Sequence, residues 1–166
     1  TYLTLSSSAT TIGSGATSAG TDAMAFGLNA TGSGAAAISI GKNSGASASG
    51  SIALGQEAKS TTTNVIAIGN ESNETYTGTD TNFLTIGARA AWANGGTTTG
   101  GQDSITIGAN TARGNGTAAN VTLGDYAVLV GSYSHYADAG NTTVGAGVVS
   151  IGRSTNRKTT GNVSSG

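Results

Sequence analysis

Residues 51–70 read SIALGQEAKSTTTNVIAIGN and contain the same four-residue motif twice. A large residue, a small residue, a second large residue and a glycine occupy positions 52–55, and the pattern returns at positions 66–69. Alternation of large and small residues has the period of two that is typical of a β-strand. Recurrence at a fixed interval indicates a repeat architecture in which similar coils stack on one another. The chain is therefore predicted to be an all-β solenoid.

The motif continues on both sides of this stretch, with a spacing that changes along the chain. In the first part the closing glycines are evenly spaced, at Gly13, Gly27, Gly41, Gly55 and Gly69. The next closing glycines, Gly87, Gly108 and Gly124, follow at longer and unequal intervals. Gly131 and Gly145 restore the first interval, and Gly152 follows half a coil later. Self-similarity of this kind predicts stacked coils of about 14 residues, with some longer ones.

The small residues of the motif decide which side chains such a coil can enclose. Ala53 and Ala67 stand between the large residues, so the face that carries them is nearly flat. A thin coil can hold only this flat face inside, and the Ile, Leu and Val side chains must then point outward. An aliphatic stripe of this size marks an interface, and a cyclic trimer about an axis parallel to the stripe buries it well. The predicted trimer core is Phe26, Ile38, Ile40, Ile52, Leu54, Ile66, Ile68, Leu84, Ile86, Ile105, Ile107, Val121, Leu123, Val130, Val144 and Ile151.

Composition agrees with a shared core and excludes several classes of function. Only 27 of the 166 residues are Ile, Leu, Val or Phe, which is few for a large core within one copy. The net charge of −1 speaks against a nucleic-acid partner. There is no cysteine, no metal-ligand spacing and no apolar run long enough to span a bilayer. We expect no cofactor and no metal, and a membrane connection only through parts outside this chain.

Residues 22–58, DAMAFGLNATGSGAAAISIGKNSGASASGSIALGQEA, carry a family resemblance. They resemble the head repeats of trimeric autotransporter adhesins, the YadA-like heads. The resemblance is strong over residues 22–70 and looser over 108–152. It implies a left-handed parallel β-roll in which three chains share one core.

A second resemblance lies at the C-terminal end, where residues 150–166 read SIGRSTNRKTTGNVSSG. This segment is similar to the neck that narrows such heads onto a coiled-coil stalk. It departs from the family at Thr159, Thr160, Gly161, Ser164 and Ser165, where bulkier residues or Ala are favoured. The implied division is a head of residues 1–149 and a neck of residues 150–166. The neck residues expected to take part in contacts between chains are Arg153, Arg157, Lys158, Asn162 and Val163.

The sequence offers little to an enzyme. Its single histidine is His135, with Ser132, Ser134 and Asp138 close by in sequence. Catalytic sets of this kind meet in space and rarely lie side by side along the chain, so His135 is interpreted as a surface residue of a coil. The carboxylates are scattered and form no pair. The prediction is that the chain is not an enzyme.

Aromatic residues are the candidates for a binding surface. The second residue after each closing glycine should lie at an outward turn, and this position holds mostly Asn, Glu and Arg but also Tyr126 and Tyr133. Two irregular stretches, residues 70–83 and 90–100, exceed the repeat and carry Tyr76, Phe83 and Trp92. Extra length on a solenoid often loops out from a working face. The alternative is local packing, with Trp92 filling a gap where coils change register.

These features favour the head of an extended fibre on the surface of a Gram-negative bacterium, held in the outer membrane through parts outside this chain. Its predicted role is multivalent adhesion to a host surface protein, matrix, a glycan or other cells. The main alternative is a phage or virion fibre or appendage for receptor recognition or structural decoration, and the segment after Gly166 would discriminate the two. An ice-binding solenoid is a further alternative suggested by LTIG, ITIG and VTLG, although Ile and Leu flank a single Thr there.

Overall fold

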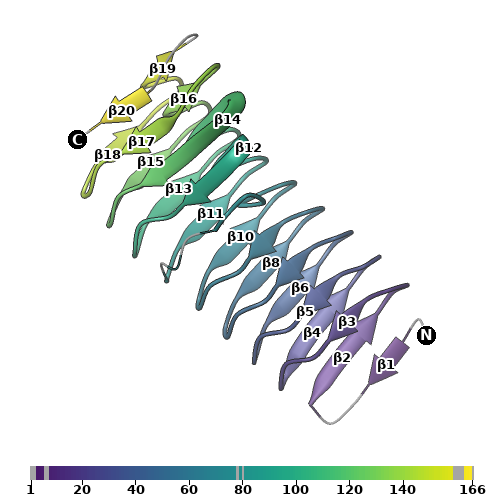
Figure 1. Cartoon of the computed structure of the whole chain (residues 1–166). Helices are drawn as coiled ribbons and strands as arrows, with labels where there is room; N and C mark the ends of the chain where they lie inside the picture. The colour runs from purple at the N-terminus through teal and green to yellow at the C-terminus, as the bar shows by residue number, and fades with distance from the viewer. Residues whose placement is uncertain (1–2, 6–7, 78, 80, 159–162, 166) are drawn as a thin grey trace.

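A computed structural model describes residues 3–5, 8–77, 79, 81–158 and 163–165. This part of the chain contains strands and turns and no helix, which confirms the all-β prediction. The coils stack in one direction from the N-terminus to the C-terminus, as a β-solenoid of the β-roll type (Figure 1).

One long sheet of ten strands runs the whole length of the solenoid. All of its neighbouring strands pair in parallel except β1 and β2, which pair antiparallel at the N-terminal end. Each strand covers the motif seen in the sequence, so Ile52 pairs with Ile66 and Leu54 with Ile68. The strands in spatial order are β1 (Leu3–Leu5), β2 (Ala9–Ile12), β4 (Ala23–Phe26), β6 (Ile38–Ile40), β8 (Ile52–Leu54), β10 (Ile66–Ile68), β11 (Leu84–Ile86), β13 (Ile105–Ile107), β15 (Val128–Val130) and β18 (Val149–Ile151).

A second, four-stranded sheet closes the coils of the N-terminal half. Its strands are short and parallel, and Thr17, Thr31, Gly45 and Lys59 pair in turn at the interval of the motif. They are β3 (Thr17–Ser18), β5 (Thr31–Gly32), β7 (Gly45–Ala46) and β9 (Lys59–Ser60).

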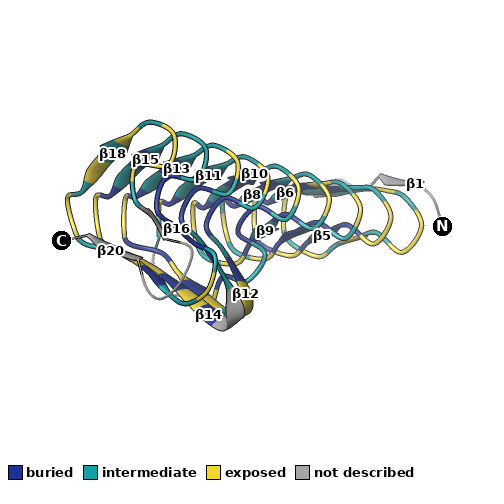
Figure 2. Ribbon diagram, turned by 90° about the horizontal axis from the view of Figure 1, so that it is seen from above, coloured by how far each residue is buried: buried dark blue, intermediate teal, exposed yellow. Residues whose placement is uncertain are grey.

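The coils lengthen in the C-terminal half, and a six-stranded sheet takes the place of the short one. The lengthening is visible in the register of the long sheet, whose successive partners are Ile66, Leu84, Ile105, Val128 and Val149. β14 pairs with β16 through its first residues and with β17 through its last ones. Figure 2 shows β12 and β14 projecting away from the long sheet. The strands are β12 (Trp92–Thr99), β14 (Arg113–Leu123), β16 (Tyr136–Ala137), β17 (Thr142–Val144), β19 (Arg157–Lys158) and β20 (Val163–Ser165).

The long sheet separates small and large side chains as the motif predicts. Ala53 and Ala67 are fully buried between two half-buried aliphatic neighbours each. The large side chains therefore lie on the outer face of the sheet, and Ile40 keeps 39% of its surface exposed. The interior of the N-terminal half is correspondingly thin and consists mainly of alanine and serine. Its hydrophobic cluster is Ala23, Ala37, Ala46, Ala53 and Ala58.

Glycine follows each long-sheet strand from β2 to β18 for two physical reasons. At Gly41 the backbone has φ of +135°, in a region that side chains disfavour. A Cβ atom placed there would also lie 2.4 Å from the carbonyl oxygen of Gly55 in the next coil. The coils thus stack closely enough at this column that only glycine fits.

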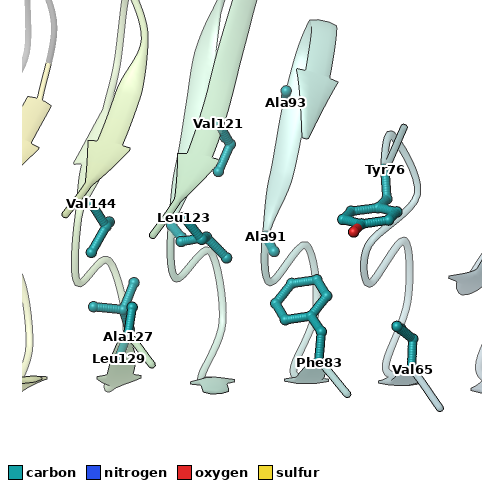
Figure 3. Packing of buried hydrophobic residues seen from close by; sticks show 11 residues of the cluster. Val65, Tyr76, Phe83, Ala91, Ala93, Val121, Leu123, Ala127, Leu129 and Val144 are labelled. Carbon is teal, nitrogen blue, oxygen red and sulfur yellow. The ribbon is translucent and has the colours of Figure 1, made fainter. Parts of the chain in front are cut away.

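A larger hydrophobic cluster fills the C-terminal half, where the coils are wider (Figure 3). Tyr76 and Phe83 lie at its start, with ring centroids 5.6 Å apart, and both are buried. Gly100 leaves room for them, since a Cβ there would lie 2.9 Å from Tyr76 and 3.1 Å from Phe83. The two rings therefore fill the space that opens where the flat coils give way to wide ones.

Three members of the predicted trimer core lie inside this cluster. Val121, Leu123 and Val144 are at most 3% exposed, so their assignment to an outward stripe is wrong. Leu123 and Val144 pair with each other in the six-stranded sheet and not with the long sheet. The apolar–Gly pairs at 123–124 and 144–145 imitate the motif, but their strands face the interior. The outward strands at these levels carry Val128 and Val149, which the predicted set omits.

The predicted neck shows no break from the coils before it. Ser150 pairs with Leu129, Arg157 with Tyr136 and Val163 with Thr142, so the described residues after 149 form one more coil. The boundary between residues 149 and 150 falls inside β18. The division into a head of 1–149 and a neck of 150–166 stays a prediction. Arg153 is exposed, Asn162 lies outside the described residues, and only the backbone of Arg157, Lys158 and Val163 is described.

Candidate functional site

The turn after the closing glycine is one residue longer in the long coils than in the short coils, and this changes which side chains face solvent. The fourth residue after the closing glycine has a left-handed backbone in these coils, with φ between +48° and +56° at Asn73, Ala91, Ala112 and His135. In a strand, a shift of one residue moves side chains to the opposite face. The fifth residue after the glycine is buried in a short coil, as at Ser60, but Trp92 and Arg113 at the same position are only partly buried.

The result is a column of large side chains on neighbouring coils, which we call the ridge: Glu74, Trp92, Arg113 and Tyr136, with Arg89 and Tyr133 of the adjacent turns. Tyr136 is only 5% exposed, so it packs within the ridge and does not face solvent. β12 and β14 place Trp92 beside Arg113, and β14 and β16 place Arg113 beside Tyr136. The Trp92 indole Nε1 donates a hydrogen bond to Glu74 Oε2 at 2.9 Å. Backbone pairing therefore holds the spacing of the ridge.

Arg113 lies at the centre of the ridge, between two aromatic rings. Its guanidinium carbon is 4.7 Å from the Trp92 ring centroid and 5.6 Å from that of Tyr136, within cation–π range. Tyr133 packs edge-on against Tyr136, with centroids 5.0 Å apart. Burial lowers the pKa of Arg113, although an arginine stays charged at any physiological pH.

The other arginine of the ridge is neutralised. Arg89 Nε donates to Glu71 Oε2 at 2.6 Å, and its terminal nitrogen donates to Glu71 Oε1 at 3.2 Å. This hydrogen bonding holds the pKa of Glu71 below its ordinary value and raises the pKa of Arg89. Arg89 also lies 5.4 Å from the Trp92 ring centroid. The two arginines therefore differ, because Arg89 has a carboxylate partner and Arg113 contacts rings and amides.

The structure separates the five aromatic residues predicted to bind. Tyr76 and Phe83 are buried in the core, so their assignment to a contact surface is wrong. Trp92 and Tyr133 both belong to the ridge, where Trp92 packs against Arg113 and Tyr133 packs against Tyr136. Tyr76 and Phe83 fill the space between the short and the long coils. Tyr126 is 61% exposed and lies in the turn that precedes β15, beside Gln102 and Asp103 of the previous coil. Tyr126 and Tyr133 therefore do not share one column.

Comparison with known families agrees with the geometry of the N-terminal half. The model of the YadA head domain repeat, which spans two copies, matches residues 7–30, 18–44, 33–58 and 46–72. Residues 7–72 therefore carry YadA-like head repeats. No curated protein and no solved structure matched the chain. Repeats of this family are typical of adhesin-type heads. The described residues include no helix long and apolar enough to cross a membrane.

His135 is not the surface residue that the sequence predicted. It is 2% exposed, in the left-handed position of its turn, with Nδ1 3.5 Å from Ser134 Oγ. Ser134 Oγ also lies 3.0 Å from Ser150 Oγ and 2.9 Å from Thr155 Oγ1. The additional turn residue causes this burial because it points into the coil.

Burial of His135 makes the stability of the solenoid depend on pH. Burial lowers its pKa from the ordinary value of 6.5, so the unfolded chain binds more protons below that pH. Stability that is fully present above about pH 6.5 should fall as the pH drops through the unfolded and then the folded pKa. We expect a lower melting temperature at pH 5 than at pH 7.5, and a smaller difference in a His135→Asn variant, which suits the left-handed backbone. An equal difference in both proteins would contradict this prediction.

Sequence reasoning missed Arg113 and Tyr136 as members of the ridge. The signal was present, because Glu74, Trp92, Arg113, Tyr136 and Arg157 all take the fifth place after a closing glycine. In the short coils that position holds small residues that face inward. Its outward orientation in the long coils depends on the additional turn residue, which the sequence pattern did not reveal.

Proposed function

We propose that the chain forms the homotrimeric head of a fibre on the surface of a Gram-negative bacterium, held in the outer membrane by other parts of the fibre. The head adheres to a host surface protein, matrix, a glycan or other cells. The outward aliphatic face of the long sheet is the observation that supports this proposal. It continues over nine successive parallel strands, from β2 to β18, and none of the described residues of the same chain covers it.

Strand direction explains why a ring of copies buries this face. The long-sheet strands from β2 to β18 all run in the same direction across the solenoid axis. Three copies around a parallel axis place their long sheets as the sides of a triangle, with the aliphatic side chains inside. The side of the sheet where the strands end in one copy then meets the side where the strands begin in the next copy. This is a heterologous contact that closes on itself.

Fully burying an Ile or Leu side chain contributes about 1.5–3 kcal/mol. The half-buried side chains of the stripe have part of this free energy still to gain, and each coil adds two of them per copy. The assembly is therefore the main source of a large apolar core for the flat N-terminal coils, whose own interior consists mainly of alanine and serine.

Adhesion in this proposal depends on presenting three equal surfaces at once. The ridge is the favoured contact surface because Trp92, Tyr133 and Arg113 all belong to it, and Tyr126 is a separate candidate in the turn that precedes β15. Linked weak contacts gain roughly 10²–10⁴ in strength over one contact without any new interaction. No turnover is involved.

Retention on surfaces of varied ligand density tests the proposal. The purified head is passed over cultured epithelial cells and over matrix-coated surfaces with decreasing ligand density. We expect slow dissociation at high density that approaches the fast rate of a single contact at low density. A dissociation rate independent of density, or no retention on any of these surfaces, would contradict multivalent adhesion.

A further inference from the structure

Arg113 forms no salt bridge with the described residues, and Glu71 acts on it only as a more distant charge. Its terminal nitrogens donate to Asn110 Oδ1 at 2.6 Å and Asn115 Oδ1 at 2.8 Å, both neutral acceptors. Its Nε atom is buried and has no hydrogen-bond partner. The ion pair in the described part of the chain joins Arg89 to Glu71, so the Glu71 carboxylate is bound to Arg89 and not to Arg113. A half-buried guanidinium with only amide acceptors is short of negative charge.

The side chain is also held in place before any ligand arrives. Trp92 and Tyr136 flank the guanidinium, and the two asparagines fix its plane. An arginine that is already ordered loses little conformational entropy when it binds, and its planar fork matches a carboxylate in two parallel hydrogen bonds. The surroundings therefore favour a planar anion over a neutral ligand.

We infer that the ridge binds the carboxylate of an acidic sugar, with Arg113 as the residue that receives the charge. This inference rests on the proposed adhesive function and names the ligand class for the contact surface. Neither neighbouring carboxylate forms a salt bridge with Arg113, since Glu71 pairs with Arg89 and Glu74 accepts a hydrogen bond from the Trp92 indole.

A sugar suits the surroundings of Arg113 better than an acidic peptide does. The described part of the chain has no pocket, so the ridge is an open surface. A rigid pyranose ring loses little entropy on such a surface, whereas a flexible peptide loses much more. Asn110 and Asn115 offer amide groups to sugar hydroxyls, and the edges of Trp92 and Tyr133 offer apolar contact. Each site is weak, and three of them in one head reach useful strength.

The test compares charged sugars with uncharged counterparts. Wild-type head is applied to polymer-linked sialyllactose and to hyaluronan, beside polymer-linked lactose and carboxyl-reduced hyaluronan. We expect binding to at least one acidic probe to exceed binding to its neutral counterpart about tenfold or more, and to weaken as salt is added. The two acidic probes separate a sialate from a uronate as the source of the carboxylate.

Variants locate the effect on the ridge. Arg113→Gln should abolish the preference for the acidic probe, whereas Lys42→Gln, which removes a charge from the N-terminal half, should retain it. Arg113→Lys keeps the charge without the fork and should bind at reduced strength. If Arg113→Gln does not assemble, Arg113→Lys decides the matter, and full binding by it would contradict the inference.

Several outcomes would overturn the inference without touching the proposed function. They are equal binding to acidic and neutral sugars, an unaffected Arg113→Gln variant, and equally strong binding to polyglutamate. If the head still adheres to cells in a density-dependent way, adhesion stands and the ligand class is wrong. If it adheres to nothing, the proposed function fails first.

Discussion

Replacing both Ile40 and Ile68 with aspartate is expected to leave single, poorly folded chains. Both side chains lie on the outer face of the long sheet, two coils apart. In a trimer each substitution places three carboxylates around one axis, where burial and mutual repulsion oppose their ionisation. The change also removes two aliphatic side chains per copy, which together contribute about 2–4 kcal/mol when the remaining exposed area is buried. Light scattering should report the mass of one chain.

A matched control places the same charges on another face. Ser47 and Thr61 are exposed on the side of the four-stranded sheet, each directly after one of its strands. The Ser47→Asp and Thr61→Asp double variant should retain the trimer mass and the wild-type melting temperature. A trimer that persists in the Ile40→Asp and Ile68→Asp variant would contradict the shared-core proposal.

The second large effect is expected from Phe83→Ala, which should destabilise the fold by about 3–5 kcal/mol. Phe83 is 1% exposed and packs against Tyr76 where the coils begin to widen. Removal of the ring leaves a cavity that the flat coils on one side cannot fill, because their interior consists mainly of small alanine and serine side chains. Urea unfolding at one fixed protein concentration measures the effect, since assembly makes stability depend on concentration.

Tyr126→Ala is the matched aromatic control for this prediction. Tyr126 is exposed at an edge turn, so its removal should change stability by no more than about 0.5 kcal/mol. The two variants also test packing apart from adhesion. A ring as deeply buried as that of Phe83 cannot touch a ligand, whereas the exposed ring of Tyr126 can. Equal unfolding midpoints for Phe83→Ala and the wild-type protein would show that the ring does not support the transition between coils.

The short-range pattern predicted most of the fold. Alternation of large and small residues around Ala53 and Ala67 predicted a strand with a flat inner face, and the structure confirms both the strand and its orientation. The closing glycine at Gly41 recurs in the motif, and its φ is positive in the structure. These features depend on local geometry, because the period of a strand and the freedom of glycine do not require distant residues.

The motif did not predict which sheet a strand joins where two strands of one coil carry the same pattern. Leu123-Gly124 and Ile107-Gly108 look alike in sequence, yet Ile107 faces outward and Leu123 faces the core. The difference lies in their partners, since Ile107 pairs with Val130 and Leu123 with Val144. Nothing within either four-residue motif specifies which sheet its strand joins.

The candidate site was predictable only in part. Trp92 and Tyr133 were named from the sequence, but Arg113 between Trp92 and Tyr136 was not, and Tyr76 and Phe83 proved to be core. Single aromatic residues in an irregular stretch give no indication of burial, because a coil of unknown length leaves their orientation open.

The sequence by itself determined that this chain forms stacked β-coils with a small-residue interior, an aliphatic outer face and glycine at the turns. It did so because each coil repeats the same local rule at the same interval. Only the tertiary structure decided where the coils widen, which strands form the six-stranded sheet and which side chains compose the ridge. The physical reason is that one additional left-handed residue in a turn reverses the facing of the residues after it, and its effect appears only when neighbouring coils are stacked.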